Sequence, residues 1–135
     1  MEKLYDVVIV GAGPAGLFAA YELITNNKKL KILLVDKGRK VETRHCPMNE
    51  RHIACQNCNP CHILSGFGGA GTFSDGKLNF VPKLGKSDLF KYMSNDEAFK
   101  LIDDTEVVFN KFEMDSEIFP SNMADAIKFQ KEVAK

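Results

Sequence analysis

The pattern of hydrophobic and polar positions predicts a strand, a helix and a second strand within the first 35 residues. Residues 5–10 end in an unbroken run of β-branched side chains, which is typical of a parallel strand covered on both faces. Residues 14–27 carry apolar side chains at helical spacing, and the proline at their start is tolerated in a first helical turn. Residues 30–35 are again rich in branched apolar side chains. Because the connections are short, the three elements form a predicted β-α-β unit.

The middle of the chain loses this periodicity. Residues 39–63 are mostly Arg, His, Cys, Asn and Pro, which predicts a long loop without a helix or strand. Residues 65–76 hold five of the ten glycines, so a second glycine-rich loop is expected, with backbone conformations that side chains would forbid. Residues 77–81 alternate polar and apolar side chains and predict a short strand.

Beyond Pro82 the composition shifts toward helix formers and acids. The sequence Ser94-Asn95-Asp96-Glu97 matches a capping box, which predicts a helix that runs to about Phe112. A last helix is expected with Ser121 as its N-terminal cap. The predicted fold class is α/β, a Rossmann-like β-α-β unit followed by a glycine-rich loop and helices, and incomplete.

Composition and charge exclude several classes of protein. The chain has 135 residues, 44% apolar and 27% charged, as expected for one soluble globular domain. Eighteen basic and eighteen acidic side chains leave no basic field that would attract nucleic acid or a membrane surface. The most apolar charge-free run, residues 7–21, is shorter than the roughly 20 residues of a membrane span, and no basic region of a signal peptide precedes it. We therefore expect a cytoplasmic protein.

A glycine motif lies between the first predicted strand and the first predicted helix. In Gly11-Ala12-Gly13-Pro14-Ala15-Gly16, the first glycine permits a tight turn, the second lets a pyrophosphate approach the main chain, and the third allows close helix packing. The helix N-terminus adds free N–H groups and a positive dipole. Asp36 ends the second strand, where an acid can bind the hydroxyls of an adenosine ribose and repel a 2′-phosphate. A glycine-rich turn without a ligand is the alternative.

Two segments carry a resemblance to known flavoproteins. DVVIVGAGPAGLFAAYEL followed by ILLVDKGRK resembles the N-terminal FAD-binding segment of the glutathione-reductase-type flavoprotein superfamily. GFGGAGTFSDGKLNF, residues 66–80, is similar to the signature of the FAD-utilising dehydrogenases, a group of NAD(P)/FAD-dependent oxidoreductases. Members of the superfamily are usually several hundred residues long, so the resemblance implies that this chain is an N-terminal fragment.

The resemblance implies a set of cofactor contacts. The glycine motif and Asp36 would surround the pyrophosphate and ribose of FAD, Lys37 and Arg44 would lie near the ADP moiety, and the second glycine-rich loop would approach the FAD with backbone N–H groups, which can form an anion site. The expected cofactor-binding residues are Gly11, Gly13, Pro14, Ala15, Gly16, Asp36, Lys37, Arg44, Gly68, Gly69, Ala70, Gly71 and Thr72.

Four cysteines lie within sixteen residues. The spacing Cys55-x2-Cys58-x2-Cys61, with Cys46 upstream, matches three ligands of a bacterial 4Fe-4S cluster plus a fourth. A zinc site with the same thiolates, in which a histidine could replace one of them, is a second interpretation. A redox pair of Cys55 and Cys58 is a third, and free thiols are a fourth.

These observations define the functional hypotheses. The first is an FAD-dependent oxidoreductase, or its FAD-binding portion, acting as a dehydrogenase on a small-molecule substrate, with NAD(P)H as a possible electron donor in the whole protein. Residues 1–81 would form the FAD-binding unit, and residues 82–135 a helical segment that begins a further region. The alternatives are a metal or Fe–S module with weak nucleotide binding and no activity of its own, and an NAD-binding regulator. No residue is assigned a catalytic role, and the sequence does not indicate an oligomeric state.

Overall fold

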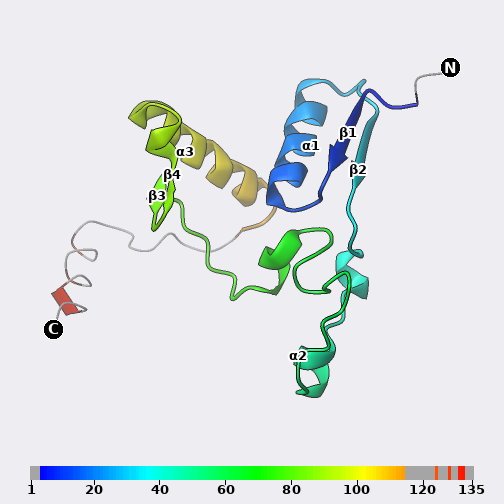
Figure 1. The fold of residues 1–135 in the computed structure, drawn as a ribbon. Coiled ribbons are helices and arrows are strands. Elements are labelled where there is room, and N and C mark those ends of the chain that lie inside the picture. The colour runs from blue at the N-terminus through cyan, green and yellow to red at the C-terminus, as the bar shows by residue number, and fades with distance from the viewer. Residues whose placement is uncertain (1–3, 115–123, 125–127, 129–130, 133–135) are drawn as a thin grey trace. The chain divides into compact units, whose positions relative to one another are not determined.

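The computed structural model describes residues 4–114, 124, 128, 131 and 132. The chain divides into two compact units, Met1–Lys77 and Leu78–Lys135. Figure 1 shows the elements along the chain. Their order is β1 (Val7–Val10), α1 (Pro14–Asn26), β2 (Ile32–Val35), η1 (Val41–Thr43), α2 (Pro47–Arg51), η2 (Gly69–Phe73), β3 (Lys83–Leu84), β4 (Ser87–Asp88), η3 (Leu89–Lys91) and α3 (Asn95–Lys111), where η marks a 3-10 helix.

The first unit begins with the predicted β-α-β arrangement. Strands β1 and β2 pair in parallel, with Val7 opposite Ile32 and Val10 opposite Val35. Helix α1 connects them and packs beside the pair, as Figure 1 shows. The α/β class and the strand-helix-strand order predicted from the hydrophobic pattern are confirmed, because branched apolar runs of this length form parallel strands.

Close packing between α1 and β1 depends on a glycine. A Cβ atom added at Gly16 would overlap the carbonyl oxygen of Gly11 and lie 3.4 Å from Cγ2 of Ile9. The helix starts with Pro14 in its first turn and with Gly13 as an extended N-cap. The third glycine of the motif therefore has the packing role expected from the sequence.

One face of the strand pair stays open in the described residues. Val8 is 56% exposed and Val10 is 84% exposed, whereas Val7 and Ile9, which alternate with them, are partly covered. The prediction that β1 is covered on both faces is therefore wrong for this part of the chain. A single helix covers only one side of a two-stranded pair, since alternate side chains point to opposite faces.

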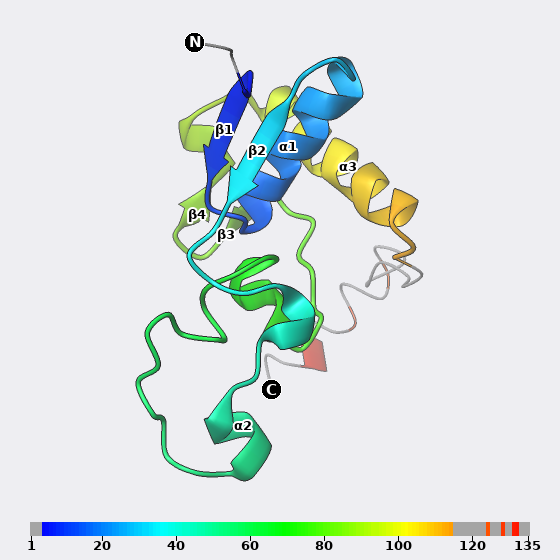
Figure 2. The same ribbon diagram turned by 90° about the vertical axis from the view of Figure 1, so that its right-hand side faces the viewer.

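Residues 39–63 contain more regular structure than predicted. A 3-10 turn forms over Val41–Thr43 and a short helix, α2, over Pro47–Arg51. Pro47 occupies the first turn of α2, where its missing N–H costs no hydrogen bond. Figure 2 shows α2 in a segment that extends away from β1, β2 and α1.

The second unit contains a β-hairpin, whose two strands have two residues each, and α3, the longest of the described helices. Strands β3 and β4 pair antiparallel, and the prediction of a strand over residues 77–81 is wrong, because those residues have no regular secondary structure. Phe80 instead packs edge to face against Phe109 of α3, with ring centroids 6.0 Å apart. Helix α3 begins with the predicted capping box, in which Ser94 Oγ accepts from Glu97 N–H and Glu97 accepts from Ser94 N–H.

The last predicted helix, capped by Ser121, lies largely outside the described residues. Within the part of the chain that the structure describes, no helix is both long and apolar enough to cross a membrane.

The capping box of α3 gives a test of the fold. Ser94→Ala removes the side-chain acceptor of the Glu97 N–H, so we expect the free energy of unfolding to fall by about 1 kcal/mol, the usual cost of losing such a cap. Urea denaturation of the full chain, followed by circular dichroism, measures this change. Ser94→Thr keeps a hydroxyl and should retain most of the stability. An equal loss in both variants would contradict the capping assignment.

Candidate functional site

The first glycine loop, Gly11–Gly16, lies where β1 ends and α1 begins. Gly11 has a φ of +106°, which favours glycine, and its N–H donates to the carbonyl oxygen of Val35 at 2.7 Å. Ala12 is fully buried. The loop therefore sits at the carboxyl ends of both parallel strands, which is the ligand-binding edge of open α/β sheets.

The N-terminus of α1 is free of competing groups. No side chain caps it, and its first turn contains no acid. A Cβ atom added at Gly13 would meet no protein atom within 4 Å, so there is space over the main chain at this point. The first N–H groups of a helix have no partner inside the helix. An anionic group can approach them here.

The Asp36 side chain links the end of β2 to the first glycine loop through hydrogen bonds. Its Oδ2 accepts the Ala12 N–H at 2.9 Å and its Oδ1 accepts the Gly38 N–H at 2.7 Å. These two hydrogen bonds, helped by the Gly66 backbone and the charge of Lys37, hold the pKa of the Asp36 carboxyl below its ordinary value, although partial desolvation opposes them. Each carboxylate oxygen has a second acceptor site, so Asp36 can still accept a hydroxyl.

The second glycine loop, residues 65–76, lies directly against the first. The Gly68 N–H donates to the Ala12 carbonyl oxygen at 2.9 Å, so both backbone polar groups of Ala12 are bonded. A Cβ atom at Gly69 would lie 3.3 Å from Cδ of Pro14 and 3.5 Å from Cα of Gly13. Of the other predicted residues in this loop, Gly71 has no protein atom within 4 Å of an added Cβ.

The second glycine loop also pairs with the chain that follows β2. Arg39 and Gly66 form an isolated parallel bridge, and the Phe67 N–H donates to the Arg39 carbonyl oxygen at 3.3 Å. A Cβ atom at Gly66 would lie 3.0 Å from Cδ of Arg44. The sequence identified this loop as glycine-rich, but it carried no signal that the two glycine loops touch.

Arg44 is buried, with 3% of its surface exposed. Its five N–H donors have five protein acceptors, and the guanidinium carbon lies 4.7 Å from the centre of the Phe73 ring. The acceptors are the carbonyl oxygens of His62 at 2.8 Å, Phe67 at 2.8 Å, Gly69 at 2.9 Å and Ile63, and Oγ1 of Thr72 at 3.4 Å. A direct contact of this side chain with ADP would replace one of these bonds, so the predicted contact stays a prediction. Lys37, its predicted neighbour, is exposed.

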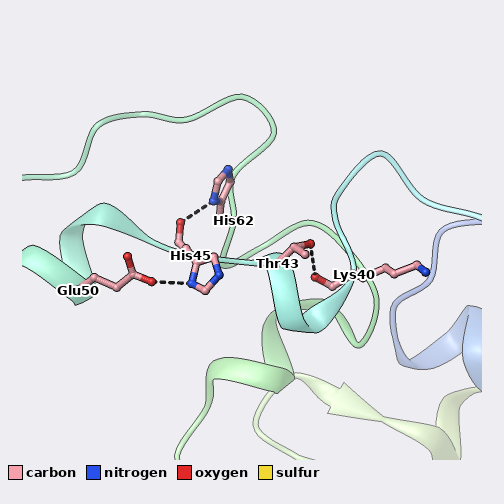
Figure 3. A network of polar contacts seen from close by, with 5 residues as sticks. All are labelled: Lys40, Thr43, His45, Glu50 and His62. Atoms are coloured by element: carbon pink, nitrogen blue, oxygen red, sulfur yellow. Dashed lines mark hydrogen bonds and ion pairs between the residues drawn. The ribbon is translucent and has the colours of Figure 1, made fainter.

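Polar contacts join the two ends of the cysteine-rich segment, residues 46–61. Figure 3 shows Nδ1 of His62 bonded to the His45 carbonyl oxygen, and Nδ1 of His45 bonded to Glu50 Oε1 at 2.7 Å. A third bond, from Thr43 Oγ1 to the Lys40 carbonyl oxygen at 3.0 Å, closes the preceding turn. The two ends of the cysteine-rich segment, next to His45 and His62, therefore lie side by side.

None of the four cysteines of this segment, all of them described by the structure, forms a disulfide. Cys55 is exposed, and Cys46, Cys58 and Cys61 are partly buried. Among the described residues, which include all four, no group of three or more His, Cys, Asp or Glu side chains is placed to hold a metal ion. The predicted iron–sulfur or zinc site therefore stays a prediction. Hydrogen bonds from the backbone of Leu64 and Ile63, with a smaller effect of the Arg44 charge, lower the pKa of the Cys61 thiol.

The sequence reasoning missed two residues of this arrangement. Ala12 has no exposed surface and bonds two other segments through its backbone, and Gly38 approaches Gly66 so closely that a Cβ atom would overlap it. Ala12 had a weak signal, since a small residue stands between two glycines. For Gly38 the sequence carried no signal beyond the residue type, because Gly66, which it approaches, lies 28 positions later in the chain.

Comparisons with known proteins agree with this geometry. Residues 5–120 match the family described as pyridine nucleotide-disulphide oxidoreductase. No solved structure gives a significant match.

Curated relatives match over short segments. A thioredoxin reductase of Listeria monocytogenes is 51% identical over 37 residues, 27% of this chain and 11% of that protein. A mitochondrial L-2-hydroxyglutarate dehydrogenase of Dictyostelium discoideum is 37% identical over 54 residues, 40% of this chain and 12% of that protein. A digeranylgeranylglycerophospholipid reductase of Methanococcus vannielii is 34% identical over 91 residues, 65% of this chain and 23% of that protein. The chain thus spans less than a quarter of the length of each of these relatives.

The depressed pKa of Asp36 predicts a pH dependence of stability. A carboxyl whose pKa is lower in the folded state stabilises the fold above its unfolded value of 3.8, and this stabilisation is lost as the pH falls through the folded value. We therefore expect the melting temperature of the wild type to exceed that of Asp36→Asn at neutral pH. The difference should shrink as the pH falls below about 4. Thermal melts from neutral to acid pH measure it, and a difference that does not shrink with falling pH would contradict the role of the charge.

Proposed function

The chain belongs to the pyridine nucleotide-disulphide oxidoreductase family, and on that premise we propose that it binds the ADP portion of FAD in a flavin-dependent oxidoreductase. The observation that carries this proposal is the first glycine loop. It places an uncapped helix N-terminus and a side-chain-free main chain at the carboxyl ends of two parallel strands. Such a site suits a pyrophosphate, because N–H groups and the helix dipole face a negative charge.

Several groups of the chain would hold the dinucleotide. The N–H groups at Gly13, Ala15 and Gly16 would bind the pyrophosphate, and the space above Gly13 would admit it. The Asp36 carboxylate, already oriented by the Ala12 and Gly38 N–H groups, would accept the ribose hydroxyls and repel a 2′-phosphate. FAD and NAD therefore suit this site better than NADP.

The second glycine loop would form another wall of the same site. Gly69 lies against Gly13 and Pro14, and Gly71 has open space at the position of a Cβ atom. Main-chain N–H groups without side chains in front of them can approach an anion closely. We include residues 68–72 in the cofactor site on these grounds.

The chemistry of the reaction belongs to the cofactor. FAD, when bound, supplies hydride or electron transfer, while the protein binds and orients it. The relatives named above are two reductases and a dehydrogenase, which supports oxidoreductase chemistry. The small-molecule substrate is part of our proposal. The family description supports NAD(P)H as the electron donor of the whole protein. No residue of this chain is assigned a catalytic role.

Gly13→Ser tests the placement of the pyrophosphate. Serine is a good helix N-cap and a Cβ atom at this position meets no protein atom within 4 Å, so we expect no loss of melting temperature. Its side chain would occupy the space of the pyrophosphate and bond the helix N–H groups in its place. We expect the affinity for FAD to fall by about 1–3 kcal/mol, the usual cost of inserting extra atoms at a closely packed contact. Titration of the full chain with FAD, followed by flavin fluorescence, measures it.

Gly16→Ala is the matched comparison. Its Cβ atom would overlap the Gly11 carbonyl oxygen, so this variant should lose thermal stability together with FAD affinity. Normal FAD affinity in Gly13→Ser would refute the pyrophosphate site. A wild-type chain that binds no FAD would refute the proposed function itself.

A further inference from the structure

The buried guanidinium of Arg44 is hydrogen-bonded to the main chain of the second glycine loop. All of its donors reach protein oxygens, and four of these are main-chain carbonyls. Two of the carbonyls, at Phe67 and Gly69, belong to the second glycine loop. A guanidinium can satisfy several carbonyls at once because its five N–H groups form a rigid planar fork.

The second glycine loop has few other sources of order. Its one regular element is the five-residue 3-10 turn Gly69–Phe73, and four of its glycines, Gly66, Gly68, Gly69 and Gly76, have positive φ angles. Glycine gains conformational freedom in the unfolded chain, so a loop of this composition needs contacts outside itself to hold one conformation. Its contacts with the rest of this unit include the Arg39 pairing, the carbonyl oxygens of Ala12 and Cys61, the Asp36 carboxylate and the Arg44 side chain.

Gly69 connects Arg44 to the first glycine loop. Its carbonyl oxygen accepts the Arg44 NH2 group at 2.9 Å, while its Cα side faces Pro14 and Gly13. Phe73 lies under the guanidinium and completes the set of contacts. The hydrogen bond from Arg44 therefore holds Gly69 in its position next to Gly13.

We infer that Arg44 is a positioning residue for dinucleotide binding: it holds the second glycine loop against the first, so that both loops contact the pyrophosphate. This inference rests on the proposed function. It differs from a direct contact between Arg44 and the ADP moiety, because the guanidinium acts through the main chain of Gly69 and Phe67.

The test compares ADP with AMP. The ratio of their dissociation constants measures what the second phosphate contributes, and a variant that only lowers the folded fraction weakens both ligands equally and leaves the ratio unchanged. Arg44→Lys keeps the charge but loses the fork. We expect its dissociation constants for FAD and ADP to rise about tenfold, as is typical when a group that orients the binding residues is lost. The AMP-to-ADP ratio should fall toward one. Isothermal titration of the flavin-free full chain, well below the melting temperature, measures all three ligands.

Two further variants complete the experiment. Arg51→Lys changes an exposed arginine of α2 in the same way and should leave every dissociation constant unchanged. Phe73→Leu removes the ring under the guanidinium and keeps Arg44, so it carries the test if Arg44→Lys does not fold. The ADP affinity of Phe73→Leu should fall about twofold to fivefold, which corresponds to the loss of a cation–π contact whose aromatic ring is partly exposed.

The outcomes separate the two proposals. An AMP-to-ADP ratio that stays at the wild-type value in Arg44→Lys, or in Phe73→Leu if that variant replaces it, would overturn the positioning role while leaving the proposed function intact. A wild type that binds ADP no more tightly than AMP would also overturn it. Failure of the wild type to bind FAD or ADP would overturn the proposed function and this inference with it.

Discussion

The arrangement of the loops depends on the hydrogen bonds that the buried Arg44 guanidinium donates. A guanidinium that is 97% covered would be costly without partners, and here every N–H group has one. Its acceptors come from residues 62–72, which otherwise have little regular structure. The same side chain therefore orders the end of the cysteine-rich segment and the second glycine loop. Loss of one partner would leave a polar group buried and unpaired, so the set of bonds favours a single conformation.

The sequence predicted those features that depend on neighbouring residues. Branched apolar runs placed β1 and β2, the helical spacing placed α1, and the capping box placed the start of α3, since each of these is a local pattern. The strand expected over residues 77–81 was wrong for the same reason. Its alternation is a local pattern, but a strand needs a partner, and Phe80 packs against Phe109 instead. Local patterns indicate what a segment can form, while tertiary contacts decide what it does form.

The role of Arg44 lay beyond such patterns. Arginine is mostly exposed in proteins, and the family resemblance implied only that Arg44 lies near the ADP moiety. Its burial results from carbonyl groups that lie 18 to 25 positions later in the chain, and main-chain carbonyls leave no mark in a sequence. The cysteines present the reverse case. Their spacing is distinctive in the sequence, yet the described structure does not bring three of them together as a set of metal ligands.

The two glycine loops are held against each other because Ala12 has both of its backbone groups in use. Its N–H is bonded to Asp36 from the end of β2, and its carbonyl oxygen is bonded to Gly68 from the second loop. A shift of either partner would therefore move the turn that precedes α1. Ala12 is also fully buried, so a larger side chain would separate the same three segments. The glycine motif at residues 11–16 supplies the permitted backbone conformations, but its geometry is set by residues up to 56 positions away. A short glycine pattern is a weak indicator by itself for this physical reason, and it becomes specific only with the acid and the second loop that hold it.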